Sequence, residues 1–331
     1  MTALLLSQAI PAFLLDKRLS GCSDYTLRNY KLTLTRLQAA LEGDPDIADI
    51  TTDQLRTFLG NLMTSRVAPA GVAPRPARRL SAKTVRNIHT CLCSFYTWAV
   101  DEDHVAEHLP RGIDVPTPEP PVIEPFTKEQ VKLLLANLSH SAPWERIPET
   151  ATERPRKRQL RDRALLLFLL DTGIRATELC NLTLGDVDLV GGSARVQSKG
   201  RMNTGQGKSR VVRFSPATAK AMQRYLTDRK ALGGRPDTPL FTTRDNRHFD
   251  RHYLSKHLHR LGRRAGVSDV HAHRFRHTFA ITYLRNGGDI YTLQDLLGHT
   301  SLEMVRRYLH IAQVDIESAH RRASPVENWR L

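Results

Sequence analysis

The stretch that most constrains this chain lies near its C-terminus and ends at Tyr308. An apolar helical run stops at Gly298, a residue type that readily takes the left-handed conformation at a helix end. Thr300 and Glu303 then match a capping box, which predicts the start of a second helix. His299 is therefore expected in a tight joint between two helices, with Tyr308 about two turns into the second one. Because a helix backbone fixes the direction of this phenol, we expect it to face a reaction partner and not the protein interior.

A tyrosine hydroxyl attacks phosphorus only when nearby cations favour its phenolate form, because its unperturbed pKa is about 10. The chain supplies cations upstream. Arg175 lies in the segment Thr-Gly-Ile-Arg-Ala-Thr-Glu-Leu, and Lys199 ends a predicted strand. His273 and Arg276 are three residues apart, so on a helix they share one face. Since a guanidinium can hold two phosphate oxygens at once, the two arginines could stabilise the charge that grows on a phosphate under attack.

A metal site is the main alternative for this part of the chain. Four histidines crowd together in the sequence: His271, His273, His277 and His299. The arginines among them would repel a cation, and no cysteine or acidic residue sits at a usual zinc spacing. Arginines also provide the charge stabilisation that metal ions supply in nucleases. We therefore expect neither a metal ion nor another cofactor.

Six positions, in a fixed order and context, resemble those of the tyrosine recombinase (phage integrase) family: Arg175, Lys199, His273, Arg276, His299 and Tyr308. The resemblance covers residues 126–310 by motif and the preceding hundred residues by general pattern only. It implies a mainly α fold with a small antiparallel β-sheet in the C-terminal domain, and two domains that form a C-shaped clamp. The chain looks more like the simple two-domain Xer-type members than like the large phage integrases.

The resemblance also implies a reaction. Tyr308 would attack a backbone phosphate of DNA and form a 3′-phosphotyrosyl link, while Arg175 and Arg276 hold the phosphate oxygens. A 5′ hydroxyl from a second strand can then reverse the step on a new partner. The bond energy is stored in the covalent link, so no ATP is required.

The remaining roles follow from the same resemblance. Lys199 would protonate the leaving 5′ oxygen, and Lys208, at the far end of an unusually long turn, is a second candidate. His273 would take part in proton transfer near the nucleophile, and His299 would donate to a phosphate oxygen. Glu178 would orient neighbouring basic residues without reacting itself.

The implied function is site-specific DNA recombination, whether in integration, excision or dimer resolution. Two alternatives remain open. A type IB topoisomerase shares much of this chemistry but needs no partner subunit, and a DNA-binding regulator could carry the same fold without activity. The complete six-residue set argues against the regulator, because a protein that only binds DNA has no use for an aimed tyrosine.

The chain divides into four segments. Residues 1–110 carry four apolar stripes at helical spacing and none of the candidate reactive residues. The resemblance makes this segment a core-binding (SAM-like) DNA-binding domain. The proline-rich residues 111–125 have little that could pack and predict an extended connector. The catalytic domain would cover residues 126–310. The tail, residues 311–331, would be a short helix that docks on a neighbouring subunit; a terminus that docks on its own subunit or frays is the alternative.

Within the C-terminal domain, residues 193–197 and 209–214 alternate apolar and polar side chains, as strands do. Thr127 with Gln130, and Ser215 with Pro216, mark the starts of two helices. Further helices are predicted over residues 250–264, 272–286 and 290–297.

The charge balance points to a polyanionic partner. The net charge is +15, from 49 Lys and Arg against 34 Asp and Glu, and neutralising phosphates releases condensed counterions. The basic residues predicted to contact double-stranded DNA lie in a Pro- and Arg-rich loop, at the start of the fourth helix, and in a basic run before an apolar helix: Arg75, Arg78, Arg79, Lys83, Arg86, Arg156, Lys157 and Arg158. A solvated basic surface is the alternative interpretation of these residues.

The sequence also bears on location and partners. No apolar run reaches the roughly 18 to 20 residues that span a bilayer, and the N-terminus lacks the features of a cleaved signal peptide. Four cysteines do not make a disulfide framework in a chain of 331 residues. We expect a cytoplasmic protein with no membrane partner. The resemblance implies a homotetramer on two DNA sites, with a dimer on each, or an assembly with a related recombinase subunit.

Overall fold

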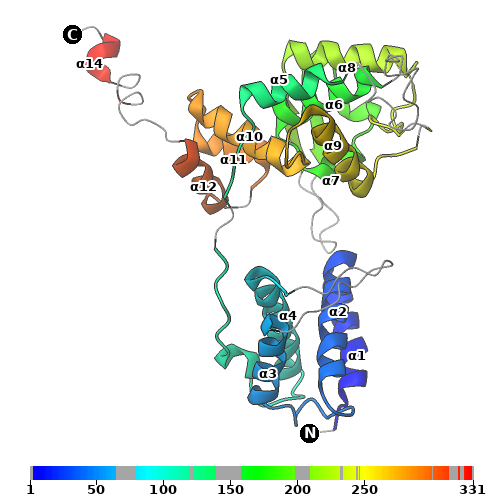
Figure 1. Cartoon of the computed structure of the whole chain (residues 1–331), viewed down its shortest axis with the longest axis vertical. Helices are drawn as coiled ribbons and strands as arrows, with labels where there is room; N and C mark the ends of the chain where they lie inside the picture. Colours follow the sequence, from blue (N-terminus) through cyan, green and yellow to red (C-terminus); the bar gives the residue numbers. More distant parts are fainter. Residues whose placement is uncertain are drawn as a thin grey trace, which may run out of the picture. The chain divides into compact units, whose positions relative to one another are not determined.

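The computed structural model describes residues 3–64, 79–119, 122–138, 158–197, 209–231, 234–243, 245, 247–299, 301–312, 320 and 324–329. The described residues form two compact units (Figure 1). One holds Met1–Pro121 and is called the N-terminal unit; the other begins at Val122 and is called the C-terminal unit.

The described part of the N-terminal unit contains the four helices that the sequence predicted. They are α1 (Leu6–Leu19), α2 (Asp24–Ala40), α3 (Thr52–Thr64) and α4 (Ala82–Asp101), followed by the short 3-10 helix η1 (Leu109–Gly112). The side chains of Ser23 and Ser81 cap α2 and α4, each accepting a hydrogen bond from a backbone N–H three residues on. Phe13, Phe95 and Trp98 meet in the core of the unit, with ring centroids 5.4 to 5.7 Å apart. Burial of this apolar cluster holds the helices together.

The predicted connector is anchored by apolar contacts near both ends. Ile113 is buried in the core of the N-terminal unit, and Val115 packs against the same core. Ile123 packs against the last helices of the C-terminal unit. The prediction that residues 111–125 have little to pack is therefore wrong, because the branched side chains between the prolines contribute to the two cores.

The C-terminal unit is mostly helical with one small antiparallel sheet, which confirms the predicted fold class. Its helices are α5 (Lys128–Ala136), α6 (Gln159–Thr172), α7 (Ala176–Asn181), η2 (Leu184–Asp186), α8 (Pro216–Asp228), α9 (Arg251–Ala265), α10 (Ala272–Arg285), α11 (Ile290–Leu297), α12 (Glu303–Ala312) and α14 (Pro325–Trp329). Two predicted helix starts are confirmed. Thr127 and Gln130 form a reciprocal capping box at α5, and the Ser215 side chain caps α8, with Pro216 as the first helical residue.

The sheet orders its strands β1, β2 and β3, each antiparallel to the next. They are β1 (Val187–Asp188), β2 (Ser193–Gln197) and β3 (Ser209–Arg213). The sequence predicted β2 and β3 but missed β1, which is too short to show any alternation. Across the β2–β3 ladder, Ala194 faces Val212 and Val196 faces Arg210. Since side chains alternate between the two faces, Arg210 shares the inner face of the sheet with buried Val196 and Val212.

Helix α6 is a buried core helix of the C-terminal unit. Leu165, Phe168 and Leu169 are buried, and the helix packs against α8 and α10 (Figure 1). It ends at Gly173, which has the left-handed φ of +57° and donates its N–H to the carbonyl of Leu169. From that end the chain turns directly to Arg175. The core helix thus determines where the first predicted cation lies.

Replacing Gly173 with alanine is expected to destabilise the C-terminal unit. The left-handed conformation costs other residue types roughly 1 to 2 kcal/mol, and an added Cβ would lie 2.5 Å from Cδ1 of Phe279. Calorimetry should show a lower melting temperature than for the wild type. The control is Gly60→Ala in α3, where a Cβ meets nothing within 4 Å and alanine should stabilise the helix by up to about 1 kcal/mol. Equal melting temperatures for the two variants would contradict the packing at Gly173.

Candidate active site

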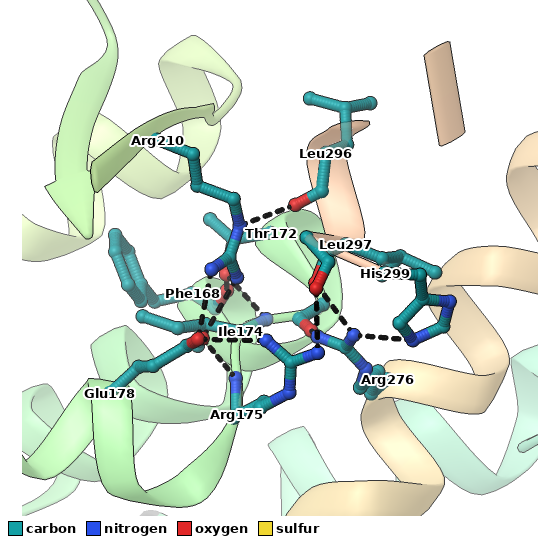
Figure 2. Close-up of polar contacts among 12 residues, drawn as sticks. Phe168, Thr172, Ile174, Arg175, Glu178, Arg210, Arg276, Leu296, Leu297 and His299 are labelled. Carbon is teal, nitrogen blue, oxygen red and sulfur yellow. Dashed lines mark hydrogen bonds and ion pairs between the residues drawn. The ribbon is translucent and has the colours of Figure 1, made fainter. Parts of the chain in front are cut away.

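Three arginines meet at the C-terminal end of helix α11, and each donates to a different backbone carbonyl (Figure 2). The bonds run from Arg210 Nε to Leu296 O at 2.8 Å, from Arg276 Nη2 to Leu297 O at 2.7 Å, and from Arg175 Nη2 to Gly298 O at 2.9 Å. The last carbonyls of a helix lack partners inside the helix and carry the negative end of its dipole. This helix end therefore draws together cations from strand β3, helix α10 and the start of α7.

Glu178, on α7, holds two of these arginines. Its carboxylate accepts hydrogen bonds from both terminal amino groups of Arg210, at 2.8 Å to each oxygen, and from Nη1 of Arg175 at 2.9 Å. It also accepts the backbone N–H of Arg175 at 3.0 Å. Burial by itself would raise the pKa of Glu178, but the hydrogen bonds from Arg210 and Arg175 outweigh it and lower the pKa to about 2. The sequence predicted that Glu178 orients neighbouring basic residues, and its carboxylate contacts two of them.

Arg276 is the most deeply placed of the three arginines, with only 1% of its surface exposed. Its Nη1 donates to the carbonyl of Gly173 at 2.9 Å, and its Nη2 lies 2.8 Å from Nε2 of His299 (Figure 2). Burial and then the nearby charge of Arg175 lower the pKa of Arg276 to about 10, so it is still a cation at neutral pH. Arg175 and Arg276 therefore converge on one helix end, although 100 residues separate them in the chain.

His299 lies directly after the left-handed Gly298, whose φ is +63°, in the predicted joint between α11 and α12. Burial and then the charge of Arg276 lower the pKa of His299 to about 4. The ring is therefore neutral at neutral pH, and its Nε2 accepts the hydrogen bond from Arg276. Its Nδ1 then carries the proton, and this atom is buried without a hydrogen-bond partner among the described residues. Thr300, the predicted cap of α12, lies outside them.

Tyr308 is buried on helix α12, with 4% of its surface exposed. Its hydroxyl lies 2.9 Å from Nδ1 of His277, on α10. Burial raises the pKa of Tyr308, and the charges of Arg276 and Arg175 only partly oppose this. The expectation that Tyr308 faces away from the interior is wrong for this chain without DNA. The apolar face of α12, which includes Val305, is packed on α10 and carries the phenol inward with it.

The histidines of α10 lie next to one another. The His273 side chain is exposed over part of its surface, and its ring centroid lies 4.3 Å from that of His277. Desolvation of the part that faces the protein, followed by the charge of Arg276, lowers the pKa of His273. Burial, followed by His273, lowers the pKa of His277 to about 4. His277 is therefore neutral at neutral pH where it contacts the Tyr308 hydroxyl. No group of three or more His, Cys, Asp or Glu residues that could hold a metal ion occurs in the described part of the chain.

Several predicted site residues lie outside the described residues: Lys199, Lys208, Arg75, Arg78, Arg156 and Lys157. Of the other predicted DNA contacts, Arg79, Lys83 and Arg86 are exposed in the N-terminal unit, and Lys83 and Arg86 lie one turn apart on α4. The Nη1 of Arg86 donates to Oγ1 of Thr117 at 3.0 Å. Arg158 precedes α6 in the C-terminal unit and is partly exposed.

Sequence reasoning missed Arg210 and His277. Arg210 could have been found from its strand. It lies two residues before Val212, so both side chains lie on the inward face of the strand, where a charged residue needs a partner. His277 falls one turn after His273 on the same helix face, and it was considered only as a metal ligand. Neither signal indicates the partner, since Glu178 and Tyr308 are distant in sequence.

Profiles of known protein families match both units of the structure. The profile of the phage integrase family matches residues 126–314, more than half of the chain. The profile of the phage integrase N-terminal SAM-like domain matches residues 15–103. Both units of the structure thus have a counterpart in the same group of proteins.

Individual relatives match over most of the chain. Tyrosine recombinase XerC of Corynebacterium efficiens is 29% identical over 306 residues, which are 92% of this chain and 87% of the relative. Tyrosine recombinase XerD of Corynebacterium glutamicum is 29% identical over 309 residues, 92% of this chain and 93% of the relative.

Solved structures share the fold at lower identity. The Tn1549 transposon integrase in complex with a circular intermediate DNA is 18% identical with a TM-score of 0.71, and the match covers 96% of this chain and 100% of that chain. The XerH site-specific recombinase bound to a palindromic difH substrate is 20% identical with a TM-score of 0.66, covering 98% and 85%.

The Glu178→Gln variant should change how stability depends on pH. A carboxyl group whose pKa is lowered by folding stabilises the folded state above its unfolded pKa, here 4.5, and loses that contribution as pH falls toward its folded pKa of about 2. The shift corresponds to roughly 3 kcal/mol. The difference in unfolding free energy between wild type and Glu178→Gln should therefore be constant above pH 4.5 and shrink below it. Glu107→Gln, at an exposed position, is the control, and a difference for Glu178→Gln that did not change with pH would contradict the ion pairs described.

Proposed function

The chain belongs to the phage integrase family, and we propose that it is a site-specific DNA recombinase that cuts and rejoins strands through a 3′-phosphotyrosyl intermediate. The observation that carries this proposal is the convergence of Arg175, Arg276 and His299 at one helix joint, with Tyr308 on the helix that follows it. A fixed cluster of guanidinium groups followed by a helix that carries a tyrosine suits transesterification at a phosphodiester. The relatives named above are recombinases, so we favour this activity over DNA relaxation or binding without catalysis.

The phosphate would be held by donors that the fold leaves for it. A guanidinium has five N–H donors. In the described contacts, the side chain of Arg175 uses two of them, on Glu178 and Gly298, and it is also the more exposed of the two predicted arginines. The Nδ1 of His299 adds a buried N–H donor. We propose that Arg175 meets the phosphate first, and that His299 donates to one of its oxygens.

Attack requires Tyr308 to leave His277. Burial raises the pKa of Tyr308 and lowers that of His277 to about 4, so both shifts keep the proton on the phenol. His277 therefore does not activate Tyr308 in this arrangement. The arrangement is a resting one. We propose that DNA binding shifts α12 and brings Tyr308 to the phosphate, where the arginines favour its phenolate.

The N-terminal unit would supply part of the grip on double-stranded DNA. Arg79, Lys83 and Arg86 form an exposed basic group at and near the start of α4. Cations of this kind favour phosphate backbones without reading sequence. Arg158 is proposed to add a contact from the C-terminal unit.

We propose that two copies bind each recombination site and that four copies assemble on a pair of sites. Helix α14 exposes Val326 and Trp329, and an apolar groove of about 670 Å³ lies between α5, α6, α8 and α10. We propose that the α14 segment of one copy docks on the C-terminal unit of another.

The described residues include no helix able to cross a membrane. We propose that the protein acts in the cytoplasm.

Replacing Tyr308 with phenylalanine should abolish covalent capture of DNA. A duplex pool with a randomised centre would first be enriched for binding by gel shift, and the recovered sequence would be made with a nick that traps the cleaved state. Wild type should give an adduct on a denaturing gel; Tyr308→Phe should bind the duplex and give none. Tyr291→Phe, at an exposed position on α11, should behave as wild type. An adduct with Tyr308→Phe would remove Tyr308 as the nucleophile.

Lys199 and Lys208 can be separated by changing the leaving group. A sulfur at the bridging 5′ position leaves without needing a proton, so it bypasses the general acid. Lys199→Ala should lose most cleavage of the normal duplex and recover on the sulfur-bridged one, whereas Lys208→Ala should cleave both. Recovery confined to Lys208→Ala would reverse the assignment.

A further inference from the structure

We infer that Arg210 is a positioning residue for the recombination chemistry, because it keeps Arg175 on the end of helix α11 and away from full pairing with Glu178. This inference rests on the proposed function. It concerns a residue on strand β3 that contacts Glu178 and Leu296 and that is not among the residues predicted to react.

Arg210 links three elements through one planar group. Its two terminal amino groups bind the two carboxylate oxygens of Glu178 at 2.8 Å each, and its Nε donates to the carbonyl of Leu296 at 2.8 Å (Figure 2). Strand β3, helix α7 and helix α11 are therefore joined at a single side chain, which is 12% exposed. A lysine could not do this, because one ammonium group cannot match the spacing of a carboxylate and a third acceptor together.

The hydrogen bonds at Glu178 determine which acceptors the Arg175 side chain binds. Arg210 occupies both carboxylate oxygens, so the Arg175 side chain makes only one contact there, from Nη1 at 2.9 Å. Its Nη2 is left to bind Gly298 at 2.9 Å. Arginine and carboxylate groups prefer two parallel hydrogen bonds. Without Arg210, Glu178 would be available to take both amino groups of Arg175 and draw them from the helix end.

Arg210 also packs against the joint itself. A Cβ built on Gly298 would lie 3.1 Å from Nη1, 3.2 Å from Cδ and 3.3 Å from Cζ of Arg210. The left-handed turn that sets the direction of His299 therefore rests on this side chain. Arg210 positions Arg175 through Glu178, and it positions His299 through Gly298 and the carbonyl of Leu296.

The test compares Arg210→Met and Arg210→Lys with Arg213→Met, an exposed arginine on the same strand. Single-turnover cleavage of the nicked, selected duplex would be measured at saturating protein, together with the dissociation constant. Both Arg210 variants should bind DNA as wild type does and cleave more slowly, on the order of 10- to 100-fold for methionine. Arg213→Met should cleave normally. If methionine prevents folding, the lysine variant, which keeps the charge, carries the comparison.

A second substrate separates positioning from general loss of structure. A methylphosphonate at the scissile position has no charge for Arg175 to neutralise, so a displaced Arg175 matters less. The defect of the Arg210 variants should shrink on this substrate. An equal defect on both substrates, or a normal rate on the phosphodiester, would overturn the inference. Absence of any adduct with wild type would instead count against the proposed recombinase activity.

Discussion

The end of helix α11 is the constraint on which the site depends. The last two carbonyls of the helix and that of the Gly298 cap need donors, and each receives one arginine from a different part of the C-terminal unit. Cations that would otherwise repel one another are gathered by the helix dipole and by the carboxylate of Glu178. A phosphate entering this place would meet charges already fixed by the fold, which is the condition under which electrostatic stabilisation of a transition state is strongest.

Such an arrangement has an energetic cost within the folded protein. Burial and the charge of Arg175 lower the pKa of Arg276 to about 10, which shows that the folded state disfavours its charge relative to water. Among the described residues, Glu178 supplies the carboxylate that pairs with Arg175 and Arg210. The cost is offset by the hydrogen bonds that Arg276 and Arg175 donate to the carbonyls of Gly173, Leu297 and Gly298. A DNA phosphate would bring the negative charge for which this excess positive charge is suited.

Local sequence patterns predicted much of this fold, and tertiary packing decided the rest. Capping residues at Thr127 and Ser215 marked helix starts correctly, because a cap is a contact between near neighbours. The burial of Tyr308 could not be predicted in this way. Val305 and Tyr308 share one face of α12, and whether that face is covered depends on α10, which no local pattern places. Arg210 was missed for the same reason, since its value lies in joining β3, α7 and α11.

The contact between Tyr308 and His277 bears on how such a protein can coexist with a genome. A cell offers it vastly more ordinary DNA than target sites, and an enzyme with its reactive hydroxyl always extended would risk breaks at each passing encounter. Sheltering that hydroxyl against α10 would protect ordinary DNA from such encounters. If DNA binding releases it, as proposed, fidelity would depend on assembly as well as on base recognition.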